Sequence, residues 1–319
     1  MGSATWQARA DVGDLKTDRW GLLLAGGDGM RLRSLTRAVS GDDRPKQFCP
    51  VMGGQTLLEQ TWRRAAPAVP RQQTMVVVTR RHERFYRPVL SALPIPHVVS
   101  QPENRGTAPG ILYPLLRLAA LQPEASVAVF PSDHHFSDDA RFVEHVDRAF
   151  HAVAADPSRI VLLGIIPDTH ETEYGWIELG ERLSGAGGRP IHEVSRFWEK
   201  PDAGLAEILR ERGCLWNSFV MVGRVRTFLG LVKRAVPDLY DAFAAVAPSL
   251  GGPDETEAVR KLYLGLPVRD FSTEVLTESP SSLGVMPVFG VTWSDLGSPE
   301  RVMRARGSME PARRQLLYA

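Results

Sequence analysis

The stretch Trp20-Gly-Leu-Leu-Leu-Ala-Gly-Gly-Asp-Gly-Met-Arg-Leu32 decides how the first part of this chain folds. An apolar run suited to a buried strand leads directly into Gly26, Gly27 and Gly29, and Arg31 follows. Glycines here allow a tight turn and the close approach of backbone N–H groups to an anion, and arginine adds donors suited to phosphate. The spacing matches neither a Walker A loop nor the dinucleotide-binding GxGxxG pattern. It therefore indicates a phosphate or nucleotide site, with a strand-to-helix turn that binds no ligand as the alternative.

Further apolar runs follow this stretch and alternate with amphipathic segments, which is typical of βα units around a mostly parallel sheet. Strands are predicted at Trp20–Ala25, Thr74–Thr79, His97–Ser100, Val127–Pro131 and Ile160–Ile165. Helices are predicted between them at Thr56–Ala66, His82–Leu93, Ala108–Leu121 and Ala140–Ala154. The expected fold class is α/β, a mostly parallel sheet flanked by helices.

The alternation breaks after about residue 166. Strands Tyr174–Leu179 and Ile191–Trp198 flank the glycine-rich segment 184–188, which predicts a hairpin. The remaining predicted elements are a strand at Leu215–Val222, helices at Arg224–Ala235 and Glu255–Leu264, an apolar segment at Leu283–Val291 and a short final helix. We therefore expect a loose arm over 1–18, a body over 19–305 with halves at about 19–166 and 167–305, and a tail over 306–319.

The composition and charge of the chain argue against several classes of protein. The chain has 319 residues, with 38 basic and 37 acidic side chains and a net charge of +1, which argues against a nucleic-acid-binding surface. No run approaches the roughly 18 apolar residues of a membrane span, and the first residues lack the apolar core of a signal peptide. Two cysteines far apart, Cys49 and Cys214, favour a reducing, cytoplasmic compartment. An enzyme or binding protein for small molecules is expected.

Three polar side chains occupy positions suited to a polyanion and a metal ion. Lys46 follows the rigid Pro45 shortly after the glycine-rich stretch; a solvated surface lysine is the alternative. Asp133 ends an apolar strand, where ligands bind in open α/β sheets and where one carboxylate with substrate phosphates commonly holds Mg²⁺. A helix cap is the alternative for Asp133, although Asp138 or Asp139 suits a cap better. Asp295 also follows an apolar run, with an aspartate-initiated turn as its alternative.

Two further motifs leave structural and functional readings open. Glu199 and Lys200 follow a predicted strand, and they form either a ligand contact or an ion pair in a loop. Asn217 next to Trp216 is a common sugar-contact pairing, and equally a buried tryptophan beside a satisfied asparagine. No Ser-His-Asp or Cys-His pattern emerges, so a side-chain nucleophile is unsupported.

Taken together, the motifs resemble the signature of sugar-1-phosphate nucleotidyltransferases, and among them most closely that of mannose-1-phosphate guanylyltransferases. The resemblance covers roughly residues 19–305 and is carried, in chain order, by Leu24–Leu32, Arg44–Phe48, Glu103–Pro109, Pro131–His134, Tyr174–Ile177, Phe197–Pro201, Trp216–Ser218 and Trp293–Gly297. It implies a Rossmann-like mixed sheet of the nucleotide-diphospho-sugar transferase type. It also implies the reaction of GTP with mannose-1-phosphate to GDP-mannose and pyrophosphate, with Mg²⁺.

The resemblance also implies a role for each matched residue. On the nucleotide side, Gly26 and Gly27 would face the nucleotide, Arg31 and Lys46 would act as catalytic groups that neutralise its phosphates, and Thr107 and Pro109 would lie against the base. Asp133 and Asp295 would hold Mg²⁺. On the sugar side, Glu199 and Asn217 would bind sugar hydroxyls, Gly175 would close on the sugar, and Lys200 would lie near the sugar phosphate. Arg31, Lys46 and Lys200 are thus expected to converge on one pocket that faces Asp133 and Asp295.

The sequence departs from the family pattern at two positions: Ser34 stands where many members have proline, and Gly106 where asparagine is usual. From the chain length, we expect no isomerase domain of the kind that larger members carry. Nucleotidyl transfer with another sugar-1-phosphate or nucleotide is one alternative, and a catalytically silent sugar-nucleotide-binding regulator is another. A glycosyltransferase is disfavoured because Asp133 is followed by histidines instead of Asp-x-Asp. The oligomeric state stays open, with a homodimer as one alternative.

Overall fold

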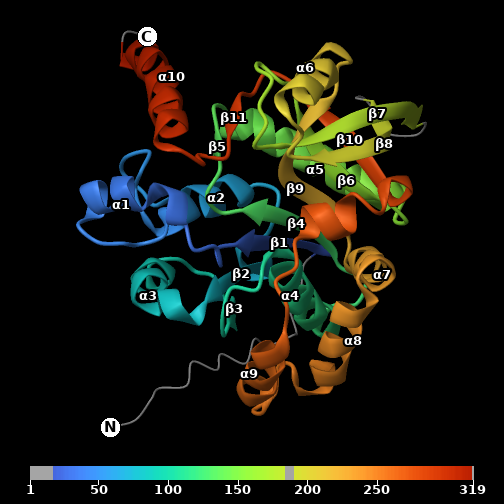
Figure 1. The fold of residues 1–319 in the computed structure, drawn as a ribbon. Coiled ribbons are helices and arrows are strands. Elements are labelled where there is room, and N and C mark those ends of the chain that lie inside the picture. Colours follow the sequence, from blue (N-terminus) through green and yellow to red (C-terminus); the bar gives the residue numbers. More distant parts are fainter. Residues whose placement is uncertain (1–16, 184–189, 318–319) are drawn as a thin grey trace.

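Strand β1 (Arg19–Leu24) carries the apolar run that precedes the glycine-rich stretch, and it lies inside a nine-stranded sheet (Figure 1). The computed structural model describes residues 17–183 and 190–317. The strand order is β3-β2-β1-β4-β9-β6-β10-β8-β7. The other strands of the sheet are β2 (Thr74–Thr79), β3 (His97–Gln101), β4 (Ser126–Pro131), β6 (Ile160–Ile165), β7 (Gly175–Leu183), β8 (Ile191–Glu199), β9 (Leu215–Arg224) and β10 (Leu283–Val288).

The sheet is mixed but mostly parallel, as predicted. Strands β1, β2, β3 and β4 pair in parallel, and so do β6 and β10. Strand β9 is inserted antiparallel between β4 and β6, and β8 pairs antiparallel with both β7 and β10. Because β9 runs against its neighbours, its amino end lies at the same edge of the sheet as the carboxyl ends of β4 and β6.

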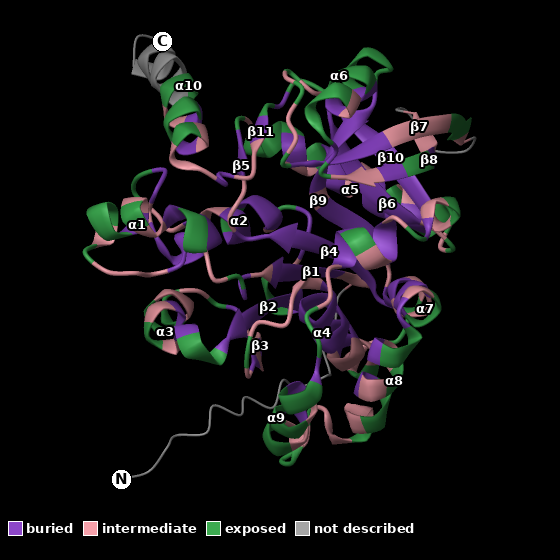
Figure 2. Cartoon of the chain, viewed as in Figure 1, coloured by how far each residue is buried: buried purple, intermediate pink, exposed green. Residues whose placement is uncertain are grey.

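Helices cover both faces of the sheet, so the inner strands β2, β4, β6 and β10 are buried along their whole length, whereas the edge strands β7 and β8 are partly exposed (Figure 2). Successive side chains of a strand point to opposite faces. Accordingly, Leu22 packs with the cluster under α4, α7, α8 and α9, whereas Leu23 packs with the cluster under α2, α5 and α6. The helices are α1 (Arg33–Ser40), α2 (Leu57–Ala65), α3 (Glu83–Ser91), α4 (Thr107–Leu121), α5 (Asp139–Ala155), α6 (Ala203–Glu211), α7 (Val225–Ala235), α8 (Pro237–Val246), α9 (Glu255–Gly265) and α10 (Pro299–Leu317).

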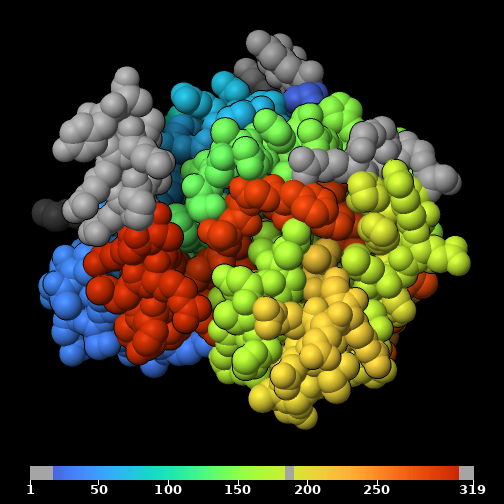
Figure 3. Space-filling model, turned by 90° about the horizontal axis from the view of Figure 1, so that it is seen from above, coloured from blue at the N-terminus to red at the C-terminus, as the bar shows by residue number. Residues whose placement is uncertain are grey.

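The first turns of helix α10 pack against the segments that follow β1. Val302 and Ala305 of this helix pack in a small cluster with Leu32 and Leu57, and Arg306 donates from Nε to the backbone oxygen of Val51 at 2.7 Å. Figure 3 shows the red C-terminal segment lying between blue and yellow-green parts of the chain. The first turns of α10 therefore sit beside the glycine-rich stretch.

Most predicted elements are confirmed, with a few differences. The apolar segment Leu283–Val291 is a strand only to Val288, because Gly290 turns the chain at a φ of 70°. The final helix was expected to be short but spans 19 residues, and α1, α6 and α8 were not predicted. The antiparallel pairing of β7 with β8 confirms the hairpin, whereas its glycine-rich segment 184–188 lies outside the described residues. No helix in the described ranges is long and apolar enough to span a membrane.

Candidate active site

The glycine-rich loop follows β1, and side chains of neighbouring segments donate hydrogen bonds to its carbonyl groups. The backbone oxygen of Gly26 accepts from Thr79 Oγ1 at 2.8 Å, and that of Gly27 accepts from Gln47 Nε2 at 2.7 Å. A Cβ atom on Gly26 would lie 2.7 Å from Gln101 Nε2, whereas one on Gly27 would meet nothing within 4 Å. Within the described ranges, no acceptor binds the backbone N–H groups of residues 26–29. These groups are therefore free to bind an anion.

Asp28 ties this loop to the segment before α4. Its Oδ2 accepts from Asn104 Nδ2 at 3.1 Å, and its Oδ1 lies 3.2 Å from Nε2 of the buried His82. Asn104 in turn accepts from the N–H of Gly106 at 3.0 Å. Asp28 belongs to the glycine-rich motif but had no predicted role, because an aspartate beside a phosphate-binding turn gives no signal of its distant partners.

Lys46 is the buried cation of the site and is held by three groups. It begins a short 3-10 turn, and only 9% of the residue is exposed. Its Nζ donates to the backbone oxygen of Asp295 and, at 3.3 Å, to that of Leu296. The same Nζ lies 3.4 Å from Oδ2 of Asp133. Lys46 therefore joins the two segments that carry the predicted metal ligands.

A short two-stranded sheet brings the two predicted carboxylates to the same place. Strand β5 (His135–Phe136) pairs antiparallel with β11 (Trp293–Ser294), with Ser294 opposite His135. Asp133 precedes β5 and Asp295 follows β11, so the pairing places both residues at one end of the ladder. Asp138, the alternative cap residue, indeed caps α5 by accepting from Arg141 N at 2.9 Å. Asp133 is therefore not needed as a cap.

Asp295 has the more strongly held carboxylate. Its Oδ1 accepts from the N–H of Gly297 at 2.8 Å, from Arg301 Nη1 at 3.0 Å and from the Tyr174 hydroxyl at 3.2 Å. Burial raises the pKa of Asp295, but Lys46, His134, Arg301 and the Gly297 N–H together outweigh it and hold the pKa below its usual range. The side chain is therefore an anion at neutral pH.

The predicted sugar-binding residues lie around the start of β7. A Cβ atom on Gly175 would lie 2.9 Å from Glu199 Oε2, so only glycine lets this carboxylate approach the β7 backbone. Burial raises the pKa of Glu199. Lys200 adopts a positive φ of 46°, donates its N–H to the Tyr174 oxygen at 3.2 Å, and places its ammonium 3.5 Å from Glu199.

Asn217 lies on β9, where it follows Trp216 in the sequence. Its Oδ1 accepts from the Phe219 N–H at 3.0 Å, so the amide is fixed. The neighbouring Trp216 contacts Tyr174 edge-on at 5.1 Å, and Tyr174 lies 4.7 Å from Trp293. The indole N–H of Trp216 is buried without a hydrogen-bond partner among the described residues. All three rings are buried in one core cluster, and successive side chains of a strand point to opposite faces, so the rings pack behind β9 on the side away from Asn217.

The three predicted cations do not all contact the two carboxylates. In the described part of the chain, Lys46 alone of the three contacts both aspartates, through the carboxylate of Asp133 and the backbone oxygen of Asp295. Arg31 is 64% exposed at its side chain and pairs with Glu173 at 3.0 Å, and Lys200 pairs with Glu199. Each of these two cations thus has a glutamate partner on or beside the segment that leads into β7. That arrangement depends on contacts between distant parts of the chain, which the motifs do not reveal.

The predicted base-binding residues begin α4. Pro109 is buried in its first turn, and the Thr107 hydroxyl donates to Asp270 at 3.0 Å and accepts from the Phe271 N–H at 2.7 Å. Gly106 has a φ of 91° and a ψ of −179°, and a Cβ atom there would lie 2.2 Å from the Arg269 oxygen. The glycine that replaces the usual asparagine is therefore required by the close approach of segment 269–271.

The donor set around Asp133 and Asp295 suits a hard divalent cation. Within the described residues there is no group of three or more His, Cys, Asp or Glu side chains that could hold a metal by itself. Mg²⁺ often takes only one or two carboxylates and completes its shell with substrate phosphates and water. With Oδ1 of Asp295 occupied by three donors, its Oδ2 and the partly exposed Asp133 carboxylate would be the oxygen ligands for such a cation.

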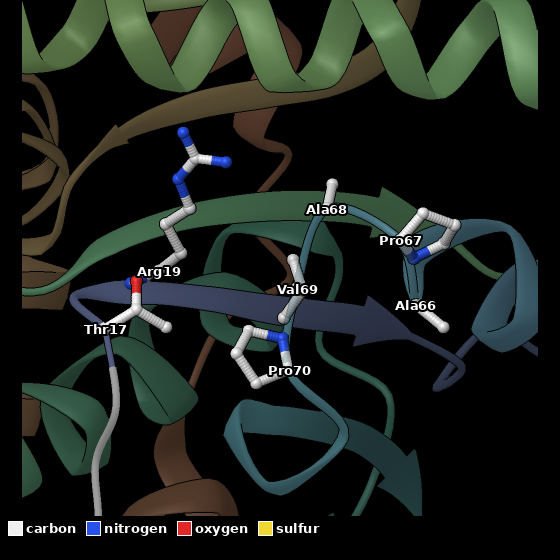
Figure 4. Close-up of a pocket in the computed structure, with 7 residues that line it drawn as sticks. All are labelled: Thr17, Arg19, Ala66, Pro67, Ala68, Val69 and Pro70. Atoms are coloured by element: carbon white, nitrogen blue, oxygen red, sulfur yellow. The ribbon is translucent and has the colours of Figure 1, made fainter.

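A separate cavity of about 380 Å³ lies near the N-terminal end of β1 (Figure 4). It is lined by Thr17, Arg19 and residues 66–70. The glycine-rich loop follows the opposite end of β1, so this cavity is remote from the candidate site.

Known proteins are similar in sequence to this chain over most of its length. A family model described as nucleotidyl transferase matches residues 20–310. The xanthan biosynthesis protein XanB of Xanthomonas campestris pv. campestris (strain B100) is 31% identical over 281 residues, which cover 87% of this chain and 57% of XanB. Mannose-1-phosphate guanylyltransferase of Escherichia coli (strain K12) is 30% identical over 286 residues, with the same two coverages. The chain thus spans little more than half the length of these relatives.

A solved structure shares the architecture as well. The crystal structure of mannose-1-phosphate geranyltransferase from Thermus thermophilus matches with a TM-score of 0.75 at 30% sequence identity, covering 88% of this chain and 77% of that one. The structure of a glucose-1-phosphate thymidylyltransferase from Bacillus anthracis, described as putative, matches with a TM-score of 0.57 at 16% identity, which concerns the fold alone.

Proposed function

This chain belongs to the nucleotidyl transferase family, and we propose that it transfers a nucleoside monophosphate from a nucleoside triphosphate to a sugar-1-phosphate, with release of pyrophosphate. The observation that carries the proposal is the contact of Lys46 with Asp133 and with the backbone of Asp295, beside a glycine-rich loop whose N–H groups are free. A buried cation, two carboxylates and an anion-binding loop form a site for a polyphosphate and a metal ion.

We further propose GTP and mannose-1-phosphate as the substrates and GDP-mannose as the product. The similarity to mannose-1-phosphate guanylyltransferase supports this choice, as do Thr107 and Pro109 at the start of α4. Glu199 and Asn217 would bind mannose hydroxyls, and Gly175 leaves Glu199 room to do so.

The attacking group in this reaction is a phosphate oxygen of the sugar-1-phosphate. The second pKa of a phosphomonoester is about 6, so this oxygen is largely ionised at pH 7 and requires no general base. The difficulty is electrostatic, because one anion approaches another. Arg31, Lys46 and Lys200 would lower this repulsion, and the N–H groups of Gly26 and Gly27 would orient the nucleotide. Asp133 and Asp295 would hold Mg²⁺, which supplies charge neutralisation for the phosphates when it is bound.

Arg31 and Lys200 meet substrate only by leaving their glutamate partners. The Lys200 and Arg31 side chains are both more than half exposed, at 59% and 64% respectively. The Arg31–Glu173 pair is exposed at both side chains and contributes at most about 1 kcal/mol, so a polyphosphate can displace Glu173 at little cost. Glu199 is only 21% exposed, so its pair with Lys200 is not a surface pair of this kind.

Two predictions concern the cellular location and the oligomeric state of the protein. Both cysteines are free and buried, in agreement with the cytoplasmic location proposed from cysteine usage. The homodimer stays a prediction.

The test is pyrophosphate release with each of four nucleotides, GTP, ATP, UTP and CTP, against mannose-, glucose- and N-acetylglucosamine-1-phosphate. The proposal requires the highest kcat/KM for GTP with mannose-1-phosphate. Faster turnover of another pair would replace the substrates and keep the reaction class. No release with any pair, together with tight binding of a sugar nucleotide, would favour the silent regulator.

A further inference from the structure

Arg301 is a mostly covered arginine that lies beside the site and belongs to none of the motifs. It lies in the first turn of α10, and only 12% of its side chain is exposed. Its Nη1 donates to Asp295 Oδ1 at 3.0 Å, and its Nη2 lies 2.8 Å from Glu171 Oε1. Its guanidinium also lies over the ring of Tyr174, 4.5 Å from the ring centre. One side chain thus bridges two carboxylates and stacks on the aromatic ring between them.

These contacts restrict Asp295 to one arrangement. Its Oδ1 accepts from Arg301, Tyr174 and the Gly297 N–H, which uses the acceptor capacity of that oxygen. A Cβ atom on Gly297 would lie 2.5 Å from the other oxygen, Oδ2, so the carboxylate is also packed closely against the backbone. Oδ2 therefore is the oxygen left for an external ligand.

We propose that Arg301 is a positioning residue, which fixes Oδ1 of Asp295 so that Oδ2 is presented to the divalent cation. Through its second contact, with Glu171, Arg301 also links this carboxylate to the segment that precedes β7. The inference rests on the proposed function, because that proposal assigns Asp295 to the metal. Groups that hydrogen-bond a metal-ligating carboxylate typically contribute 10- to 100-fold to metal affinity.

The role requires an arginine. The planar guanidinium donates in two directions at once, which lets it reach Asp295 and Glu171 while it stacks on Tyr174. Lysine carries the same charge on one nitrogen and would satisfy one carboxylate at a time. A substitution by lysine therefore separates the positioning effect from the effect of charge alone.

The experiment measures Mn²⁺ affinity by electron paramagnetic resonance, with GTP present and without a sugar phosphate. The variants are Arg301→Gln, Arg301→Lys, Asp295→Asn and the double variant Arg301→Gln/Asp295→Asn. Arg304→Gln, which removes an exposed arginine from the same helix, is the matched control. Thermal melting of each variant reports whether the fold is intact.

We expect Arg301→Gln to weaken Mn²⁺ binding by about 10-fold or more, Arg301→Lys to weaken it by a smaller factor, and Arg304→Gln to leave it unchanged. In the Asp295→Asn background, Arg301→Gln should cause no further loss. If Arg301→Gln does not fold, the comparison is made with Arg301→Lys alone and in the Asp295→Asn background.

Wild-type affinity in folded Arg301 variants, or an equal loss with and without Asp295, would overturn the positioning role and leave the proposed function standing. Failure of the wild-type protein to bind Mn²⁺, or wild-type affinity in Asp295→Asn, would instead refute the metal assignment, and the role of Arg301 with it.

Discussion

Replacement of Gly106 by alanine should destabilise the protein far more than a glycine-to-alanine change usually does. With a φ of 91° and a ψ of −179°, Gly106 lies in a region that is essentially restricted to glycine, and a side chain there costs about 1–3 kcal/mol. The new Cβ would also lie 2.2 Å from the Arg269 oxygen, so segment 269–271 must move.

That movement breaks hydrogen bonds on both sides of the contact. Arg269 N donates to the Arg105 oxygen at 3.0 Å, and Ala108 N donates to the Arg269 oxygen at 3.1 Å. The Thr107 hydroxyl bonds Asp270 and Phe271 just beyond. With about 1 kcal/mol for each of two lost backbone bonds, the free energy of unfolding should fall by about 3–5 kcal/mol.

Gly41→Ala is the matched control. Gly41 has a similar positive φ of 77°, but a Cβ atom there meets nothing within 4 Å. Its substitution should cost about 1–2 kcal/mol, the penalty of the left-handed conformation alone. Urea unfolding of both variants, followed by circular dichroism, measures the difference. If Gly106→Ala costs no more than Gly41→Ala, the contact with Arg269 does not constrain the loop. Gly106→Ala should also raise the KM for the nucleotide, since Thr107 follows directly.

Three further predictions test other parts of the site. Lys46→Met should lower turnover by at least about 10²-fold, the effect of one preorganised electrostatic group, and initial rates of pyrophosphate release measure it; near-normal rates would remove Lys46 from the reaction. Glu173→Gln should leave the urea midpoint unchanged and lower the nucleotide KM by up to about fivefold, because the exposed pair with Arg31 contributes at most about 1 kcal/mol; an increase in KM would mean that Glu173 assists binding. Burial raises the pKa of Glu199, so its ionisation opposes folding, and the stability present below its ordinary pKa is lost as pH rises through the folded-state value. Glu199→Gln should therefore be more stable than the wild type at pH 7, with the difference shrinking toward pH 4; a variant less stable at pH 7 would contradict this.

The parts of the fold that the sequence predicts are those with a strong local pattern. Strand β2 is a run of six buried residues and β6 another, and both match the predicted bounds because their short length and β-branched residues favour a strand where periodicity alone does not decide. Helix α1 was missed because a single residue, Thr36, is buried in it, so it carries no apolar stripe. Helix α10 is longer than predicted although Gly307 and Pro311, two residues that disfavour a helix interior, lie within it.

The residues of the site likewise fall into those that the sequence predicts and those that it does not. Residues within motifs, such as Lys46, Asp133 and Asp295, could be named from sequence, and the structure brings these three together. The partners that hold them could not be named. Arg301, Glu171 and Glu173 have ordinary neighbours in the sequence, and their contacts join positions more than a hundred residues apart or lie just outside a motif. Tertiary contacts of this kind have no local signal.

The most direct test of the proposed site is pyrophosphate release from GTP and mannose-1-phosphate as a function of Mg²⁺ concentration, measured for the wild-type protein and for Asp133→Ala. We predict Mg²⁺-dependent release by the wild type, and release at background level by a variant that melts at the wild-type temperature. A variant that retains wild-type rates and wild-type Mg²⁺ dependence would show that Asp133 plays a structural part only and would contradict the proposed site.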